Sequence, residues 1–430
     1  MAKVGILDLG SGYLKVVIAE GDNITPTILA AQHFRSKGVN KGAIVKTSLA
    51  RKVLKEALEQ IENLIGDNLK TYHVLISHPA IKSENVKVRL PLGENPVEIT
   101  EEHLNRLQSE AFNKAKENGY TVIHTLPKYF LLDGEKYYEP LGLWASNLEA
   151  EYHIIKLPVS VEKNIHRLLV SVGYKPGKIL FPSLMAYKVV LDEDEAELNS
   201  LIIDIGYTTS GFLYVKEGAP TESGVVDVGL KNVIEAIAKY YKVPSKEIEN
   251  LIENYGLENL LTENEQSMVV TIKPREDRQV EVNLVEFTQL LAEQIGYLLE
   301  KVLLEVYKKG INLDKDLDRF IFVGGFANIK GLKLFLESLL EKEIRIGKPS
   351  TVDSMEPDVD SPLYTPAIGA TVYLEQYAEE ESFYDLFGLP EKEQSIDLPP
   401  IVEPELNEEE KPKGFFKRII ASIKRLFSED

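Results

Sequence analysis

Two segments in opposite halves of this chain share one pattern of strand, glycine turn and strand, and this repeat constrains the fold more than any other feature. Residues 4–19 and residues 201–215 each end an apolar strand with an aspartate, Asp8 or Asp204. A turn with glycine and hydroxyl residues then leads into a second apolar strand. The chain has 430 residues, which is more than one hydrophobic core usually organises. The repeat therefore predicts a doubled α/β architecture in which the two turns form a pair of jaws.

The residue types in these turns are suited to hold phosphate groups and a metal ion. Gly10 and Gly206 let the backbone approach a ligand closely, and backbone N–H groups in such turns can cradle phosphate oxygens together with nearby hydroxyl groups. Lys15 can add a cation, and Asp8 and Asp204 would hold Mg²⁺ through water, since Mg²⁺ prefers carboxylates and retained waters. One such turn alone is common, but two in a doubled chain predict a phosphate-binding cleft. The hydroxyl groups belong to Ser11, Thr208 and Thr209.

Two further segments fit this arrangement. Residues 320–331 contain an apolar strand that ends in Gly324-Gly325, and paired glycines after a strand allow close packing against a flat ligand such as adenosine. An ordinary strand-to-helix turn would have the same sequence pattern. Residues 365–370 open a helix rich in small residues, which permits close helix packing at an interdomain hinge or, equally, in a tight core.

The remaining pattern predicts a separate α+β insert over residues 80–157 and a regular helix near 48–65, with Thr47 or Ser48 as the N-cap of that helix. In the second half, the apolar residues of a helix near 284–308 are expected to lie in the core. The other expected elements are helices near 100–118, 160–172 and 183–192 and strands near 71–77, 120–131, 148–157, 178–181 and 200–206.

The last segment of the chain predicts an amphipathic helix. Large apolar residues recur at helical spacing along one face of residues 414–427, and Lys and Arg residues lie on the opposite face. This pattern is typical of a helix in the membrane interface, with its cations toward anionic headgroups. The apolar residues are Phe415, Phe416, Ile419, Ile420, Ile423, Leu426 and Phe427, and the basic residues are Lys413, Lys417, Arg418, Lys424 and Arg425.

An acidic, proline-rich segment separates this helix from the last folded element. Residues 378–412 cannot bury a core and are predicted to be a disordered tether. From Lys411 onward six Lys and Arg residues stand against two Asp and Glu residues, whereas the whole chain carries a net charge of −19. A terminal helix docked on its own domain is the alternative, but the tether favours a membrane anchor.

Composition excludes several other classes of protein. The chain has no Cys and only seven scattered His, which argues against disulfides and zinc sites and fits a cytosolic protein. The net charge of −19 argues against nucleic acid as a partner. No apolar run is long enough to span a membrane, and the N-terminus enters the first strand without a signal-peptide pattern.

The order of these features resembles the superfamily of actin, sugar-kinase and heat-shock-chaperone ATPases, and within it the FtsA family of bacterial cell-division proteins. The resemblance extends over nearly the whole length. Its most specific parts are the insert, which corresponds to subdomain IC of that family, and the terminal helix after an acidic linker. The matching segments are 41–45, 74–77, 124–129 with Asp133-Gly134, 140–142 and 148–151.

The resemblance implies an actin-like two-domain ATPase fold, built from duplicated ribonuclease-H-like domains, that binds ATP with Mg²⁺ and polymerises into filaments. It implies attachment to the cytoplasmic face of the membrane at the division site, and contacts of subdomain IC with other division proteins. It also implies binding of the FtsZ C-terminal peptide by subdomain IIB, with the helix near 284–308 as the expected region of contact. The nucleotide-binding positions carried over are Gly10, Ser11, Gly12, Tyr13, Lys15, Gly206, Tyr207, Thr208, Thr209, Gly229, Lys231, Glu249, Gly324, Gly325 and Phe326.

The same resemblance sets the expected domain boundaries. These are 1–82 and 159–195 for subdomain IA, 83–158 for IC, 196–228 and 313–360 for IIA, 229–312 for IIB, 361–377 for a helix that returns to IA, 378–412 for the linker and 413–427 for the amphipathic helix.

The chain departs from the family pattern near the expected ribose contact. Many members carry Glu-x-x-Lys in subdomain IIB, but here the stretch beginning at Glu249 has Ile252 in place of the lysine. No residue stands out as the base that would activate water, so hydrolysis is expected to be slow, with ATP serving mainly to close the cleft. The alternatives are a platform like PilM of type IV pili, which generally lacks a terminal membrane helix, and a small-molecule kinase, which needs an aspartate base beside an acceptor pocket.

Overall fold

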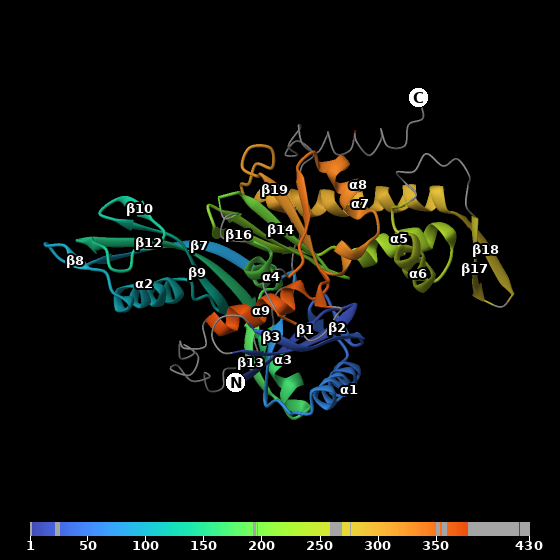
Figure 1. The fold of residues 1–430 in the computed structure, drawn as a ribbon, viewed down its shortest axis with the longest axis horizontal. Coiled ribbons are helices and arrows are strands. Elements are labelled where there is room, and N and C mark those ends of the chain that lie inside the picture. Colours follow the sequence, from blue (N-terminus) through green and yellow to red (C-terminus); the bar gives the residue numbers. More distant parts are fainter. Residues whose placement is uncertain are drawn as a thin grey trace.

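The computed structural model describes residues 2–21, 26–191, 195, 197–258, 269–275, 277–349, 353–354, 359–376 and 421. Three larger sheets organise these residues (Figure 1). We call them the N-terminal sheet, the insert sheet and the C-terminal sheet. The N-terminal and C-terminal sheets lie one above the other in the view of Figure 1, and the insert sheet extends to one side.

The N-terminal sheet has six strands in the order β13-β6-β1-β2-β3-β21. Strand β1 pairs antiparallel with β2 and parallel with β6, so the first glycine turn joins the two central strands. The helices packed against this sheet are α1 (Thr47–Ile65), α3 (Val159–Ser171) and α9 (Thr365–Gln376). Helix α4 (Pro182–Val190) packs on α9 and against β14 and β15 of the C-terminal sheet. The strands are β1 (Ala2–Leu9), β2 (Tyr13–Gly21), β3 (Thr27–Arg35), β6 (Thr71–Leu75), β13 (Lys175–Leu180) and β21 (Asp353–Ser354).

The C-terminal sheet repeats the same central arrangement, which confirms the predicted duplication. Its order is β16-β15-β14-β19-β20, and β14 pairs antiparallel with β15 and parallel with β19. The strands are β14 (Ser200–Ile205), β15 (Ser210–Lys216), β16 (Ala219–Val226), β19 (Arg319–Val323) and β20 (Glu343–Ile346). The helices of this half are α5 (Leu230–Tyr241), α6 (Ser245–Tyr255), α7 (Leu284–Lys308) and α8 (Leu332–Leu340), and a hairpin of β17 (Val269–Arg275) and β18 (Arg278–Asn283) projects beside them (Figure 1).

The predicted insert is a four-stranded antiparallel sheet with one helix and its own hydrophobic cluster. Its strand order is β10-β9-β12-β7, and the helix α2 (Glu101–Lys114) packs on the sheet. The strands are β7 (Lys82–Pro91), β9 (Tyr120–Leu132), β10 (Glu135–Tyr137) and β12 (Asn147–Pro158), and the short strands β8 (Val97–Glu98) and β11 (Trp144–Ala145) pair beyond them.

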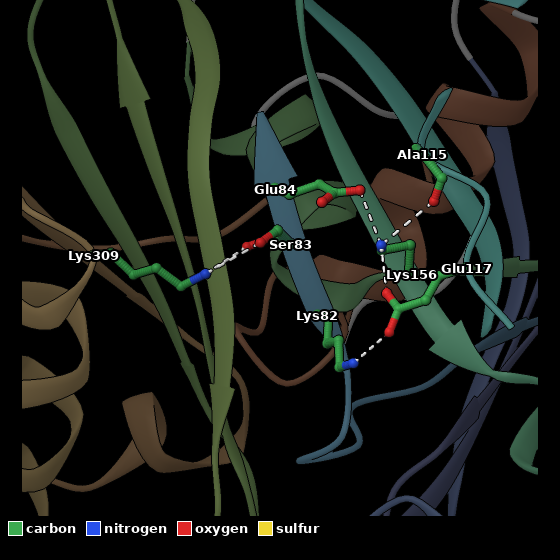
Figure 2. Close-up of polar contacts among 7 residues, drawn as sticks. All are labelled: Lys82, Ser83, Glu84, Ala115, Glu117, Lys156 and Lys309. Atoms are coloured by element: carbon green, nitrogen blue, oxygen red, sulfur yellow. Dashed lines mark hydrogen bonds and ion pairs between the residues drawn. The ribbon is translucent and has the colours of Figure 1, made fainter. Parts of the chain in front are cut away.

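A buried ammonium group anchors the base of the insert (Figure 2). Lys156 on β12 is 3% exposed, and its Nζ lies 2.9 Å from a carboxylate oxygen of Glu84 and 2.7 Å from one of Glu117. The second oxygen of Glu117 accepts from Lys82 at 2.7 Å. On the opposite side of β7, Lys309 of the C-terminal half donates to the hydroxyl of Ser83 at 2.9 Å, so the insert is also fastened to the other half of the molecule (Figure 2).

The expected helix near 48–65 is present as α1, but its predicted N-cap is wrong. Thr47 and Ser48 both lie inside the helix, and Lys46 occupies the cap position without a side-chain cap bond. The backbone N–H groups of Val45 and Lys46 both donate to the carbonyl of Gly38, at 2.8 and 3.1 Å, which fixes the chain one residue before the hydroxyl residues. The expectation for residues 284–308 is confirmed, since α7 buries its apolar face in the core of the C-terminal half.

Candidate functional site

The two glycine turns meet between the N-terminal and C-terminal sheets. The hydroxyl of Thr208 donates to that of Ser11 at 2.8 Å, which joins the turns directly. A Cβ atom on Gly12 would lie 2.8 Å from the Cβ of Tyr207, closer than real Cβ atoms approach, so only glycine permits this contact. A Cβ atom on Gly10 would lie 2.4 Å from the carbonyl oxygen of Tyr13. The two predicted turns are therefore brought together. Their close approach depends on Gly12, and Gly10 allows the first turn to fold tightly on itself.

The second turn is supported by the start of α5. The N–H of Gly206 donates to the carbonyl of Thr209 at 2.9 Å, and the N–H of Lys231 donates to the carbonyl of Tyr207 at 2.7 Å. A Cβ atom on Gly229 would lie 2.7 Å from the backbone nitrogen of Thr208. Gly229 and Lys231 thus support the turn through their backbone, while the side chain of Lys231 pairs with Glu235 at 3.5 Å.

Three charged side chains lie at the base of the turns. The Nζ of Lys15 lies 2.5 Å from Oδ2 of Asp8 in a largely buried ion pair. Burial raises the pKa of Asp204 to about 6, with Asp8 adding to the effect and Lys15 opposing it. Burial would lower the pKa of Lys15, but Asp8 and Asp204 together hold it above its ordinary value. The two carboxylates carry more negative charge than one ammonium neutralises, so the donor set fits a hydrated Mg²⁺ ion.

The double glycine after β19 allows the backbone to lie directly against the carboxylate of Asp204. Gly324 has φ of +81°, and a Cβ atom there would lie 2.3 Å from Oδ1 of Asp204. Gly324 also donates its N–H to the carbonyl of Pro362 at 2.9 Å. The side chain of Phe326 is 1% exposed and its ring lies 6.4 Å from that of Phe322, so it belongs to the core. Any contact of Phe326 with a ligand in the cleft would therefore involve its backbone, as would any contact of Gly325.

The carboxylate of Glu249, predicted at the ribose position, is held by residues from both halves. Its oxygens accept from Arg35 at 2.7 and 2.8 Å, and Oε1 also accepts from the hydroxyl of Tyr207 at 2.8 Å. Hydrogen bonding to this carboxylate, together with burial as the larger cause, raises the pKa of Tyr207 to about 12. Ile252, which stands where many family members have lysine, is buried in the core.

Several residues of the cleft were not predicted from the sequence. Arg35 is the last residue of β3 and lies opposite Tyr13 in the β2–β3 register, so its place follows only from that pairing. The N–H of Lys41 donates to the hydroxyl of Thr208 at 3.1 Å, and its Nζ pairs with Asp227 at 2.6 Å. The signal for Lys41 was present in segment 41–45, which carries part of the family resemblance, but no role was assigned to it.

The membrane-facing residues predicted from the sequence, 413–427, lie outside the described residues except for Ala421, and so does the linker over 378–412. Within the described ranges, no helix combines the length and apolar character that crossing a membrane would require. The same part of the chain contains no group of three or more His, Asp or Glu side chains arranged to hold a metal ion.

Comparisons with known proteins agree with this architecture. A family model described as the SHS2 domain inserted in FtsA matches residues 79–156, and one described as cell division protein FtsA matches residues 201–369. Cell division protein FtsA of Borreliella burgdorferi is 24% identical over 375 residues, covering 85% of this chain and 89% of that protein. FtsA of Escherichia coli (strain K12) is 23% identical over 381 residues with the same coverage.

Among solved structures, a chain of the PilM–PilN type IV pilus biogenesis complex has a TM-score of 0.61 at 14% identity, covering 86% of this chain and 98% of that chain. At this identity the similarity concerns the fold alone, and it agrees with the actin-like architecture. The two family models match the insert and the second half separately, and the relatives extend over most of the chain. This protein therefore belongs to the FtsA family of actin-like bacterial cell-division proteins.

Proposed function

We propose that this protein binds ATP with Mg²⁺ in the cleft between its halves, forms filaments on the cytoplasmic face of the cell membrane, and anchors FtsZ filaments there during cell division. The observation that carries the proposal is the meeting of the two glycine turns, joined from Ser11 to Thr208, in a chain that belongs to the FtsA family.

Each part of the cleft has a distinct task in this proposal. The backbone of Gly10–Tyr13 and of Gly206–Thr209 surrounds the phosphate groups, and Lys15 adds positive charge near them. Asp8 and Asp204 hold Mg²⁺ through water, and the ion neutralises phosphate charge when it is bound. The backbone of Gly324 and Gly325 packs against the adenosine, and Gly324 carries no side chain that would collide with Asp204. Binding in this cleft holds the two halves together and so favours contacts between copies in a filament.

Attachment to the membrane and to FtsZ belongs to other parts of the chain. The apolar face of residues 415–427 enters the acyl boundary, and Lys417, Arg418, Lys424 and Arg425 attract anionic headgroups. The second half, over residues 229–312, receives the C-terminal peptide of FtsZ, and the insert contacts other proteins of the division site. Family membership supports both assignments, because the curated relatives are cell-division proteins.

Electron microscopy on lipid monolayers tests the proposal. With Mg-ATP and a monolayer that contains anionic lipid, the full chain should form filaments that lie on the lipid. A monolayer of neutral lipid is the control, and it should recruit less protein because the headgroup attraction is lost. Absence of filaments and of bound protein on the anionic monolayer would contradict the proposal.

A further inference from the structure

We infer that Arg35 is a positioning residue that latches the two halves of the molecule together at the mouth of the cleft and thereby slows nucleotide release. Arg35 ends β3 in the N-terminal sheet, and it contacts residues of both turns and of α6. The part of this inference that concerns nucleotide release rests on the proposed function. The part that concerns closure of the halves does not.

The geometry of Arg35 is that of a clamp. Its Nη2 lies 2.7 Å and 2.8 Å from the two carboxylate oxygens of Glu249 on α6. Its guanidinium carbon lies 5.2 Å from the ring centre of Tyr13, in the first turn, and 5.4 Å from that of Tyr207, in the second. A planar, permanently charged guanidinium can hydrogen-bond at its edge and stack on aromatic rings at its faces, which an ammonium cannot do equally well. One side chain thus joins three elements, two of them in the C-terminal half.

Burial distinguishes this ion pair from the pair of Lys41 and Asp227, which also crosses the cleft. The side chain of Glu249 is 12% exposed and that of Arg35 is 44% exposed. In the pair of Lys41 and Asp227, both side chains are more than 40% exposed. Exposed pairs contribute little because water screens them, whereas a charge-assisted bond to a desolvated carboxylate contributes more. Lys41 therefore serves as an internal control for Arg35. It is also a cation that crosses the cleft, but its ion pair with Asp227 is exposed to water.

The contacts of Glu249 link the latch to the ligand site. Tyr207 donates to Glu249 at 2.8 Å and is the residue directly before Thr208, whose hydroxyl meets Ser11. When the halves separate, Arg35 no longer contacts Glu249 or the ring of Tyr207, so the second turn loses the contact that Arg35 makes with it. A nucleotide held by that turn can then leave. Lys246 on α6 itself also lies 3.9 Å from Glu249. Arg35 is the cation that hydrogen-bonds Glu249, and because it comes from the opposite half it is in place only when the cleft is closed.

Distance measurements between spin labels test the latch without any ligand. The chain has no Cys, so Arg51→Cys on α1 and Lys239→Cys on α5 give one labelled position in each half of the full-length protein. Arg35→Ala should shift the distance distribution toward longer separations. Glu249→Ala should shift it less, because the contact of Arg35 with the ring of Tyr207 remains. The double variant should shift it by less than the sum of the two single changes, because they share the contact between Arg35 and Glu249. Lys41→Ala should leave the distribution unchanged.

Release of a fluorescent ATP analogue tests the functional consequence. Arg35→Ala should release the analogue about five- to tenfold faster than the parent, since the closed population falls. Arg35→Lys, which retains the charge, should give an intermediate rate because it lacks the planar group that stacks on Tyr13 and Tyr207. The latch would be overturned if Arg35→Ala left the spin-label distances unchanged and if Arg35→Ala and Arg35→Lys both released the analogue at the rate of the parent. If the parent protein itself binds no analogue while Arg35→Ala still opens the cleft, the latch stands and the proposed nucleotide site fails.

Discussion

At the scale of single residues, the cleft depends on glycines at places where a side chain would occupy the space of a functional group. Gly324 is the clearest case, because its φ is +81° and a Cβ atom would lie 2.3 Å from Oδ1 of Asp204. Gly310 has a similar φ of +86°, but nothing lies within 4 Å of the position of its Cβ. A side chain at Gly310 would therefore cause backbone strain alone, whereas a side chain at Gly324 would cause both backbone strain and a steric clash.

We predict that Gly310→Ala costs about 1 kcal/mol of stability, the cost of a left-handed backbone for a residue with a Cβ. Gly324→Ala should cost more than this and should also abolish Mg-ATP binding, because the carboxylate of Asp204 must move. Chemical denaturation and calorimetry measure the two effects. Equal stability of the two variants, with binding intact in Gly324→Ala, would contradict this account of the double glycine.

The pKa of Asp204 makes a pH-dependent prediction. Burial raises this pKa from its ordinary value of 3.8 to about 6, so the folded protein binds the proton more tightly than the unfolded chain does. Ionised Asp204 therefore costs stability, and the cost develops as pH rises from about 4 to about 6. Without ligand, Asp204→Asn should be more stable than the parent at pH 7.5, by on the order of 1 to 3 kcal/mol, and equally stable near pH 4.

The same substitution should remove Mg-nucleotide binding, because the carboxylate that holds the ion is lost. A variant that gains stability and loses binding identifies a residue kept for function rather than for folding. Lower stability of Asp204→Asn at pH 7.5 in thermal unfolding would show that the carboxylate supports the fold instead.

The role of a residue could be predicted from the sequence where it follows from neighbouring residues in the chain. It could not be predicted where it depends on contacts with the opposite half of the molecule. The glycines and hydroxyls of both turns, with Asp8 and Asp204, were predicted because they belong to one repeated pattern. The position of Arg35 was not, since it depends on the register of β3 against β2 and on α6 across the cleft. Phe326 stays a predicted nucleotide-binding residue, but its buried ring beside Phe322 leaves only its backbone for that contact.

At the scale of elements, the base of the insert tests how a buried charge acts. Lys156 is buried, while the side chains of its partners Glu84 and Glu117 are 44% and 38% exposed. Removing the charge leaves two carboxylates that water can reach. Removing both carboxylate charges leaves a buried ammonium without compensation.

We predict that Lys156→Met changes the free energy of unfolding by less than about 1 kcal/mol, because an apolar side chain of similar length replaces the buried ion. Glu84→Gln combined with Glu117→Gln should destabilise the protein by about 3 kcal/mol. Urea denaturation measures the free energy of unfolding of both variants and shows which of them is destabilised more. The reverse order of stability would mean that the ion pairs themselves hold the insert in place.

The predicted terminal helix can be tested separately from the folded part of the chain. We predict that Phe416→Glu with Ile420→Glu abolishes sedimentation with anionic liposomes, because both charges enter the apolar face. Ala421→Glu with Ser428→Glu adds the same charge outside the apolar stripe and should reduce sedimentation only in part. Equal loss in both variants would indicate simple charge attraction, and no loss in the first variant would reject the anchor.

Most helices and many of the strands were predicted from periodicity, and the exceptions have physical causes. Strand β7 opens with four polar residues, 82–85, so no strand was predicted over 82–91. The cap of α1 is set by bonds from Val45 and Lys46 to Gly38, which lies in a separate turn. Both misses arise where tertiary contacts, rather than local propensity, decide the conformation.

At the scale of the whole molecule, the duplication was predictable and the placement of the insert was not. Several polar bonds join the base of the insert to the C-terminal half. The hydroxyl of Ser83 donates to the carbonyl of Ser223 at 2.6 Å, and Asn85 donates to Glu222 at 2.6 Å. His153 lies 2.8 Å from the hydroxyl of Ser223, and burial lowers the pKa of this histidine to about 3, so it is neutral at physiological pH. Such contacts leave no periodic signal in the sequence.

Calorimetry of Mg-ATP binding tests most directly whether the meeting turns form a nucleotide site. The comparison is between the parent, Asp204→Ala with Thr208→Ala, and the matched control Asp277→Ala with Thr271→Ala on the exposed β17–β18 hairpin. The parent and the control should bind with equal affinity, and the cleft variant should show no measurable binding. Binding by the cleft variant with the affinity of the parent would contradict the account.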